Sequence, residues 1–188
     1  MNHLYKYVLT GCVFFSQLAS AETVSFDATQ LAALNPGVSD SFQVNLLGSG
    51  FTSGTDGGGV NFTYDPAVLR VDSLELDPAN WDFFADTGLI DNSAGTVTGV
   101  EFATSSLSLP SDFVVGTVAF TAVGVGTSIL SLSESFGIGG WALLGDPQDV
   151  SFVDSSVTVS AVPLPASFWL LTSGIVGLFG ATKRRKEG

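Results

Sequence analysis

Residues 22–161 of this chain contain no cysteine, histidine or lysine, because the only cysteine and the only histidine, Cys12 and His3, lie before them. Without a thiol or an imidazole the region cannot build a Ser-His-Asp or Cys-His centre, a thiolate or imidazole metal site, or a disulfide. Carboxylates remain, as a general acid and base or as calcium ligands. No spacing among them selects a pair, so we expect a protein that is not an enzyme and has no cofactor, with calcium as the alternative.

Positive charge is also scarce, with 6 Lys and Arg against 18 Asp and Glu. Five of those cations and Glu187 lie outside residues 22–161, which leaves Arg70 against 17 acids and a net charge of about −16. Proteins bind nucleic acid by neutralising its phosphates with clustered Lys and Arg. We therefore expect no nucleic-acid partner, whereas cations, neutral polysaccharide and proteins with basic patches remain.

The first 21 residues have the layout of a secretory signal peptide. Lys6 precedes a short apolar stretch, and Ala19 and Ala21 form an A-x-A cleavage site before Glu22. The alternative lies inside the same stretch, where residues 9–12 (LTGC) fit a lipobox that would make a lipidated Cys12 the mature N-terminus. Either way, the chain is predicted to be exported.

Residues 162–188 predict a spacer, a membrane span and a cytoplasmic stop. A helix over residues 166–182, which are uncharged, would be about 26 Å long and would just span a thin bilayer. The cations that follow would hold that end in the cytoplasm by the positive-inside bias. The stop consists of Lys183, Arg184, Arg185 and Lys186, and the extended, proline-containing spacer before the helix consists of Val162, Pro163, Leu164, Pro165 and Ala166.

Between the two targeting segments, residues 22–161 predict one domain built of β-strands. Polar and apolar residues alternate in 41–46, 60–64 and 155–161, which places their apolar residues on inward faces. About nine strands with Gly-rich turns predict an all-β fold, a single jelly-roll-like β-sandwich. The only helical signal besides the membrane segment is a turn at 28–34. The predicted strands are 24–26, 41–46, 60–64, 69–74, 96–102, 114–122, 128–132, 150–153 and 155–161.

Two tryptophans of this domain are candidate carbohydrate-binding residues. Trp81 lies in a loop-like aromatic stretch, residues 80–84 (NWDFF), and Trp141 follows two glycines. Exposed indole rings stack on sugar faces, but a tryptophan in a sandwich is more often buried in the core or as a loop plug. Burial is therefore the favoured interpretation, and a sugar platform is the alternative.

The middle of the chain resembles a cohesin domain. The resemblance is carried by residues 40–46 (DSFQVNL), by residues 58–71 (GGVNFTYDPAVLRV) with their Asp65-Pro66 turn, and by residues 115–122 (VGTVAFTA). A physical reason supports the turn, since the Asp65 side chain can cap it, Pro66 fixes φ, and Val68 and Leu69 then return to the core. The resemblance implies a cohesin-like sandwich that binds a protein through one sheet face, as cohesins bind dockerins.

The tail resembles the PEP-CTERM sorting signal, in which a Pro-x-Pro motif precedes an apolar helix and a basic cluster. Residues 162–186 follow this layout, with Leu164 where the motif of that family has Glu. The resemblance implies recognition, and cleavage near the motif, by an exosortase-like membrane enzyme. Gly174 and Gly177 on the helix would permit the close approach of another helix, or they simply suit a short apolar helix.

Together these features predict an exported, non-enzymatic adhesion protein of the cell surface or extracellular matrix. It would be anchored in the inner membrane through residues 166–182 before processing. Its partner would be a surface protein or an extracellular polysaccharide, and the alternative function is that of a carbohydrate-binding module. The sequence leaves the ligand, calcium dependence, tail cleavage and oligomeric state open.

Overall fold

The computed structural model describes residues 21–106 and 109–161, and these form strands with a single short helix. The predicted signal peptide of residues 1–21, apart from Ala21, and the whole predicted sorting segment of residues 162–188 lie outside the described residues. Within the described ranges, no helix is long and apolar enough to cross a membrane. The elements are β1 (Glu22–Phe26), α1 (Ala28–Ala33), β2 (Ser41–Ser49), β3 (Gly57–Thr63), β4 (Leu69–Leu76), β5 (Phe84–Asp91), β6 (Thr96–Ala103), β7 (Phe113–Ala122), β8 (Gly126–Glu134), β9 (Ala142–Leu143), β10 (Asp146–Pro147), β11 (Val150–Val153) and β12 (Ser155–Val159).

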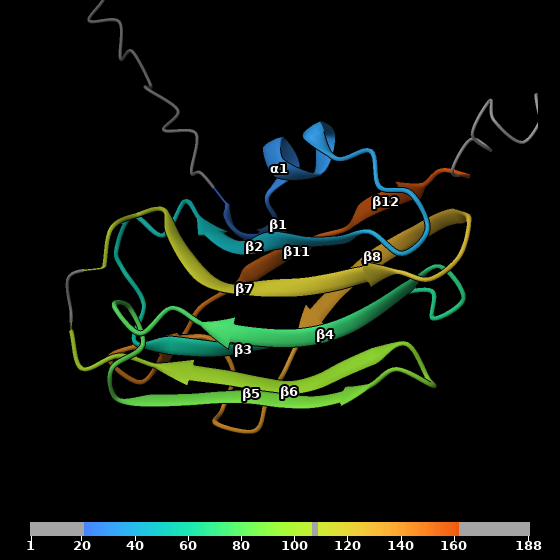
Figure 1. Ribbon diagram of the computed structural model, residues 1–188. Helices are drawn as coiled ribbons and strands as arrows, with labels where there is room; N and C mark the ends of the chain where they lie inside the picture. Colours follow the sequence, from blue (N-terminus) through green and yellow to red (C-terminus); the bar gives the residue numbers. More distant parts are fainter. Residues whose placement is uncertain (1–20, 107–108, 162–188) are drawn as a thin grey trace, which may run out of the picture.

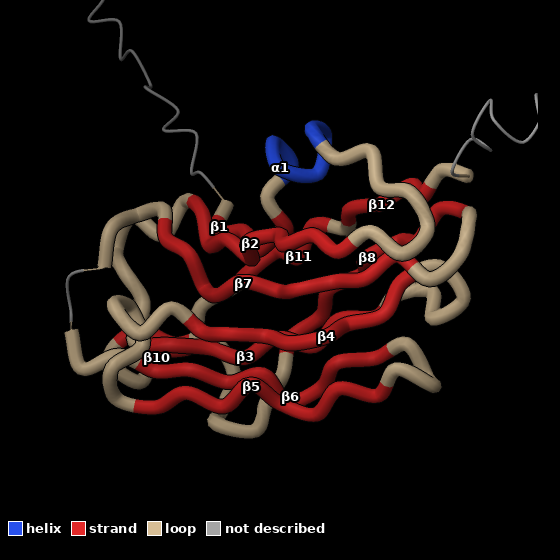
Figure 2. The backbone as a smooth tube through the Cα atoms, viewed as in Figure 1, coloured by secondary structure: helices blue, strands red, loops and turns tan. Residues whose placement is uncertain are grey.

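The strands form two sheets (Figures 1 and 2). Sheet one has the order β11-β1-β2-β7-β4. Sheet two has the order β12-β8-β3-β6-β5, with the short β9–β10 hairpin paired to the start of β3. Every pairing is antiparallel except that of β1 with β11. The helix α1 lies outside the strand layers and contacts β2 and β12 (Figure 2).

The last strand changes sheets at Asp154. β11 pairs with β1 in sheet one, and β12, which follows after one residue, pairs with β8 in sheet two. The carboxylate of Asp154 accepts hydrogen bonds from Ser131 Oγ at 3.0 Å and from the Leu132 backbone N–H at 3.2 Å. The Asp154 side chain thus accepts from a backbone N–H of β8 that β12, which begins one residue later, does not reach. The passage of the chain from β11 to β12 closes one side of the sandwich.

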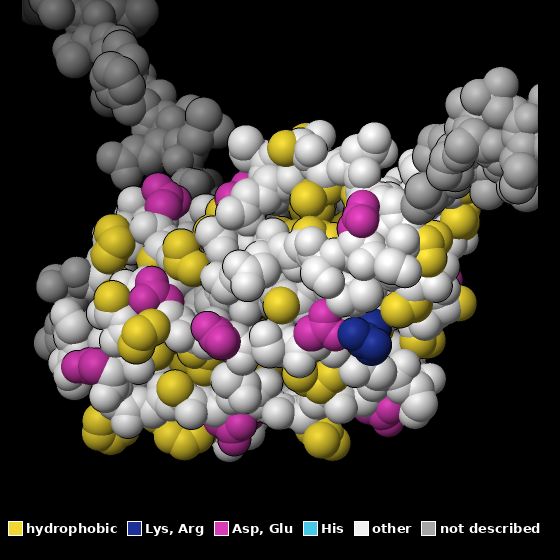
Figure 3. All heavy atoms as spheres, in the orientation of Figure 1, with side chains coloured by type: hydrophobic (Ala, Val, Ile, Leu, Met, Phe, Trp, Pro, Cys, Tyr) yellow, Lys and Arg dark blue, Asp and Glu magenta, His cyan; other side chains and the backbone are white. Residues whose placement is uncertain are grey.

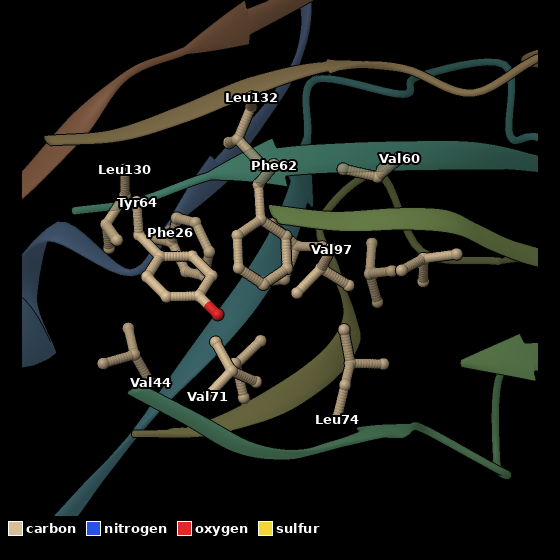
Figure 4. Packing of buried hydrophobic residues seen from close by; sticks show 14 of the residues in the cluster. Phe26, Val44, Val60, Phe62, Tyr64, Val71, Leu74, Val97, Leu130 and Leu132 are labelled. Atoms are coloured by element: carbon tan, nitrogen blue, oxygen red, sulfur yellow. The ribbon is translucent and has the colours of Figure 1, made fainter. Parts of the chain in front are cut away.

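The core lies between the sheets and is rich in aromatic residues. Phe62 of sheet two packs edge-on against Phe26 of sheet one, with ring centroids 5.4 Å apart. Phe120 of β7 contacts both rings, at 6.2 and 6.4 Å. Figure 4 shows the side chains of both sheets pointing into this space. Such burial of apolar surface is the main stabilising contribution to a domain of this size.

All nine predicted strands are present, and three more occur that the sequence pattern did not predict: β5, β9 and β10. The prediction placed Ala161 on an inward face, which is wrong: β12 ends at Val159, and Ala161 is exposed. The predicted helical turn at 28–34 forms as α1, whose N-cap Asp27 accepts hydrogen bonds from the backbone of Thr29 and Gln30.

The Asp65-Pro66 turn has the structure that its sequence predicts. Asp65 Oδ1 accepts a hydrogen bond from the Ala67 N–H at 2.8 Å, and the Asp65 carbonyl accepts from the N–H groups of Val68 and Leu69. Val68 and Leu69 are buried. The role of Asp65 is therefore that of a turn former.

One asparagine joins the two sheets on the side away from β12. Asn92, in the turn between β5 and β6, accepts hydrogen bonds at Oδ1 from the Val71 N–H at 2.8 Å and from the Tyr64 hydroxyl at 2.7 Å. Its Nδ2 donates to the Val71 carbonyl at 2.9 Å. Val71 belongs to β4 of sheet one, whereas Tyr64 directly follows β3 of sheet two. The side chain therefore fixes the β5–β6 hairpin to the edge of the opposite sheet.

We expect Tyr64 to ionise only above the ordinary tyrosine pKa of about 10. Burial raises the pKa of its hydroxyl most, the Val71 backbone opposes this rise, and the charge of Asp91 adds to it. A raised pKa in the folded state means that the contribution of Tyr64 to stability is complete below pH ~10 and is lost as the pH rises through the folded value. The measurement is a pH titration of phenolate absorbance. Subtracting the curve of Tyr64→Phe from that of the natural chain leaves the titration of Tyr64 alone, without Tyr5 and Tyr7. A component that titrates at or below pH ~10 would contradict the buried hydroxyl.

Candidate binding surface

Both candidate tryptophans are buried, so the sugar-platform interpretation is wrong for these residues. Trp81 is 3 % exposed, and its Nε1 donates to the Val115 carbonyl at 2.7 Å. Trp141 is 1 % exposed, and its Nε1 donates to the Gly59 carbonyl at 3.1 Å. Neither indole presents a face to solvent, and both serve the core.

Trp141 plugs one end of the sandwich. Its ring centroid lies 5.1 Å from that of Phe51 and 5.3 Å from that of Phe102, and Phe113 lies at 6.5 Å. Strand β3 leaves room for the indole only because it has a glycine, Gly58, at the contact. A Cβ added to Gly58 would lie 2.3 Å from the indole Cδ2. The indole thus packs directly on the backbone of Gly58, and Gly59 supplies the carbonyl that its Nε1 binds.

The outer faces of the two sheets differ in the apolar side chains that they expose. On sheet one, β1, β2, β4 and β7 carry none of the exposed large hydrophobic residues of the described chain, and β11 carries one, Val153, which is 47 % exposed. On sheet two, Leu89 is 70 % exposed on β5, Ile129 is 61 % exposed on β8, and Phe84 is 40 % exposed. We call this outer surface the β5–β8 face, and it consists of Phe84, Asp86, Leu89, Asp91, Thr96, Thr98, Glu101, Asn61, Thr63, Ile129, Ser131 and Ser133.

Strand register places these residues on one face. Leu89 pairs with Thr98 and Asp86 with Glu101, and each of these pairs lies outward because the flanking Val97, Val100 and Phe102 of β6 are fully buried. Asn61 ties the face together across β3, since its Oδ1 accepts from the Gly99 N–H at 2.7 Å and its Nδ2 donates to the Glu134 carbonyl at 2.9 Å.

The β5–β8 face is acidic. Asp86, Asp91 and Glu101 lie on it, and the single cation of the described residues, Arg70, lies on β4 of sheet one, 2.8 Å from Asp72. Hydrogen bonds from the Ser93 side chain and from the backbone of Ala94 and Ser93 hold the pKa of Asp91 below its ordinary value. Asp91 is therefore ionised at neutral pH. Figure 3 shows the opposite side of the molecule, on which the single described cation lies beside an acidic side chain, and hydrophobic atoms reach the surface along its lower edge, where Figure 1 places β5.

Residues 135–141, here called the 135–141 loop, cross onto this face after β8. Ser135 Oγ donates to Glu101 Oε1 at 3.0 Å, and Ser135 N donates to the Gly59 carbonyl at 3.1 Å. The loop lies so close to the Glu101 carboxylate that a Cβ on Gly137 would be 1.9 Å from its Oε1. Its two large apolar side chains are exposed, Phe136 to 70 % and Ile138 to 43 %.

A surface depression on sheet one is a weaker candidate. It is lined by Leu47, Val114, Asp77, Asn80 and Asp112, among others. Its carboxylates already serve the local backbone, since Asp77 accepts from the Ala79 N–H at 3.0 Å and Asp112 from the Gly50 N–H at 3.1 Å. They act as loop braces, and no large exposed apolar side chain accompanies them.

The described residues bring no three His, Cys, Asp or Glu side chains together as a metal-ion site. Calcium binding remains a sequence-based expectation to which no residue is assigned. Ala21 is the only residue of the predicted cleavage site that the structure describes. Ala19, the spacer of residues 162–166 and the basic stop of residues 183–186 lie outside the described residues.

Comparison with known proteins identifies the class of fold. No protein-family model matches the chain, and no curated protein matches it. Among solved structures, the seventh ScaB type I cohesin of Pseudobacteroides cellulosolvens is similar at 17 % identity and a TM-score of 0.57, covering 77 % of this chain and 96 % of that one. The sixth cohesin of scaffoldin B from Acetivibrio cellulolyticus, solved in complex with a dockerin, has 17 % identity and a TM-score of 0.58, covering 75 % and 100 %. A non-cellulosomal cohesin of the archaeon Archaeoglobus fulgidus has 14 % identity and a TM-score of 0.55, covering 79 % and 96 %.

These likenesses show the fold. The described part of the chain is a cohesin-like β-sandwich, as the residue pattern of 40–46, 58–71 and 115–122 predicts. At these identities the resemblance carries no binding residue across, so the candidate surface rests on the exposure, register and charge of this chain alone.

The residues that form this surface carry no distinctive signal in the sequence. Leu89 and Ile129 look like ordinary strand residues until register shows which side they face. Phe136 and Ile138 could have been noticed, because each is followed by glycine in residues 135–141 (SFGIGGW), and apolar residues between glycines are poor candidates for a packed strand.

Proposed function

We propose that this chain is an exported, non-enzymatic adhesion module that holds a protein partner through its β5–β8 face. The observation that carries the proposal is the unequal distribution of exposed large apolar residues, which are present on β5 and β8 and, within sheet one, limited to Val153 on the edge strand β11. Exposed apolar side chains set among polar ones on one sheet face are a common feature of protein-binding sites. The dockerin complex of the Acetivibrio cohesin shows that a sandwich of this fold serves protein binding in that protein.

Export and sorting form the second part of the proposal. The N-terminal 21 residues support secretion, and residues 162–186 support membrane anchoring followed by processing by an exosortase-like enzyme.

The described chain ends beside Pro36, whose carbonyl accepts from the Ser160 N–H at 2.9 Å. β8 leads away from this end, and its nine residues at about 3.3 Å each reach roughly 30 Å to the 135–141 loop. An anchored module would therefore hold that loop away from the membrane.

The charge of the face gives the test. Thr98→Lys introduces a cation at its centre, and Gln43→Lys introduces the same charge on the exposed face of β2 in sheet one. Each full-length variant would be immobilised in detergent and exposed to the proteins that the source cells secrete. The amount of secreted protein that each variant retains is then measured. Because the face is acidic, a complementary partner is basic, so Thr98→Lys is expected to weaken retention about tenfold or more and Gln43→Lys to leave it unchanged.

Two results would count against the proposal. Equal retention by both variants would mean that the β5–β8 face is not the contact. Retention that survives protease digestion of the secreted material would instead identify polysaccharide as the partner, and the carbohydrate-binding alternative would replace the protein-binding function.

A further inference from the structure

The 135–141 loop combines buried ends with an exposed middle. Ser135 and Trp141 are 7 % and 1 % exposed, whereas Phe136 and Ile138 between them are 70 % and 43 % exposed. An exposed Phe and an exposed Ile, two residues apart on one short loop, leave a large apolar area in water. Isolated exposed hydrophobic residues need no explanation, but contiguous ones mark contact surfaces.

The loop is held in place rather than loosely tethered. Trp141 fixes one end in the core, and its N–H donates to Glu134 Oε1 at 3.0 Å. Ser135 fixes the other end through Gly59 and Glu101. Within the loop, the Gly139 N–H donates to the Phe136 carbonyl at 3.1 Å. Because these bonds already order the backbone, little conformational entropy is lost when the loop binds, which favours affinity.

Carboxylates lie beside the loop that carries the two apolar side chains. Glu101 and Glu134 brace the loop, and Asp86 pairs with Glu101 across the β5–β6 ladder. The single cation of the described residues, Arg70, lies on the other sheet beside Asp72. A second copy of this chain would therefore bring carboxylates against carboxylates at this face. The complementary surface instead has an apolar pocket with Lys or Arg around it.

We infer that the 135–141 loop is the anchor of the interface, and that Phe136 and Ile138 insert into an apolar pocket rimmed by Lys and Arg on a protein partner. This inference rests on the proposed function and deepens it. Rigid aromatic side chains near the centre of an interface commonly contribute most of its binding energy. Glu101 and Glu134 then have two roles, bracing the loop and attracting the cations of the partner. The buried Trp141 acts through the loop as a positioning residue.

The test uses a displayed library of random short peptides selected on the immobilised full-length chain in detergent. Peptides that combine Lys or Arg with large apolar residues are expected to be enriched. Binding of the selected peptides to Phe136→Ser and to Ile138→Ser should be about tenfold weaker or worse. The matched control is Val125→Ser, which removes a side chain that is 60 % exposed in the turn before β8, at the opposite end of that strand. It should bind as the natural chain does.

Thermal unfolding of each variant separates lost binding from lost folding, because exposed side chains contribute little to stability. Enriched peptides without cations, or full binding by both loop variants, would overturn the inference. If the loop variants bind normally while Thr98→Lys does not, the β5–β8 face binds without its loop, and only the inference fails. If none of the three changes alters binding, the proposed function fails with it. Self-association that Phe136→Ser abolishes would identify a second copy as the occupant, which also overturns the inference.

Discussion

Trp141→Ala is expected to lower the free energy of unfolding by about 3–5 kcal/mol, because removing a large buried aromatic side chain leaves a cavity that the surroundings fill only in part. The indole contacts Phe51, Phe102 and Phe113, and its Nε1 bonds the Gly59 carbonyl. Gly58 beneath it has no side chain that could move into the space. Chemical denaturation of the full-length chain, monitored by the near-UV circular dichroism of its tryptophan and tyrosine side chains, measures the change in the free energy of unfolding.

The neighbouring Phe136→Ala is the matched control, since it removes another aromatic ring from the same loop. That ring is 70 % exposed, so its loss should change stability by no more than about 0.5 kcal/mol. If Trp141→Ala instead left the unfolding transition in place and removed retention by a glycan, the indole would be a sugar-binding platform after all, and the burial described above would be wrong.

The strands that the sequence predicted have residues with two clearly different faces. Val60 and Phe62 on β3 are buried, while Asn61 between them is partly exposed, and this period of two is visible without any structure. The Asp65-Pro66 turn was equally predictable, because a carboxylate capping its own turn is a local interaction.

β5 could not be predicted in the same way. It pairs only with β6 at the edge of sheet two, and none of its residues is buried. An edge strand of this kind has no hydrophobic period, so its formation depends on a partner that is close in space and whose register the sequence does not show. The hairpin of β9 and β10 has two residues in each strand, too few for any period.

The candidate site shows the same limit. Burial of Trp141 was the favoured expectation, but its partners Phe51 and Phe102 are distant in sequence, so the sequence did not show how the indole is packed or what the 135–141 loop exposes. The charge of the domain was evident from composition. Its arrangement was not: the location of Arg70 on the sheet opposite the β5–β8 face follows only from strand order.

Asn92→Ala is expected to lower the free energy of unfolding by about 2–4 kcal/mol, a large effect for a polar residue in a turn. Its removal leaves the N–H and the carbonyl of Val71 and the hydroxyl of Tyr64 without their partner. Each unpaired buried polar group costs about 1–3 kcal/mol, and entry of water at the partly buried site reduces the sum. Ser93→Ala in the same turn removes only one exposed side-chain hydrogen bond, to Asp91, and should change stability by about 0.5 kcal/mol or less.

The location of the effect distinguishes a bridge between the sheets from an ordinary turn contact. Because Asn92 fixes the β5–β6 hairpin to β4, its loss should speed amide hydrogen exchange in β4, β5 and β6 more than in β1 and β2. Asn92→Asp keeps an oxygen acceptor for Val71 and Tyr64 but loses the donor to the Val71 carbonyl, so its cost should lie between those of the natural residue and alanine. Uniform acceleration in all strands, with equal costs for both substitutions, would mean that Asn92 stabilises the turn alone and that the sheets are joined only through their apolar core.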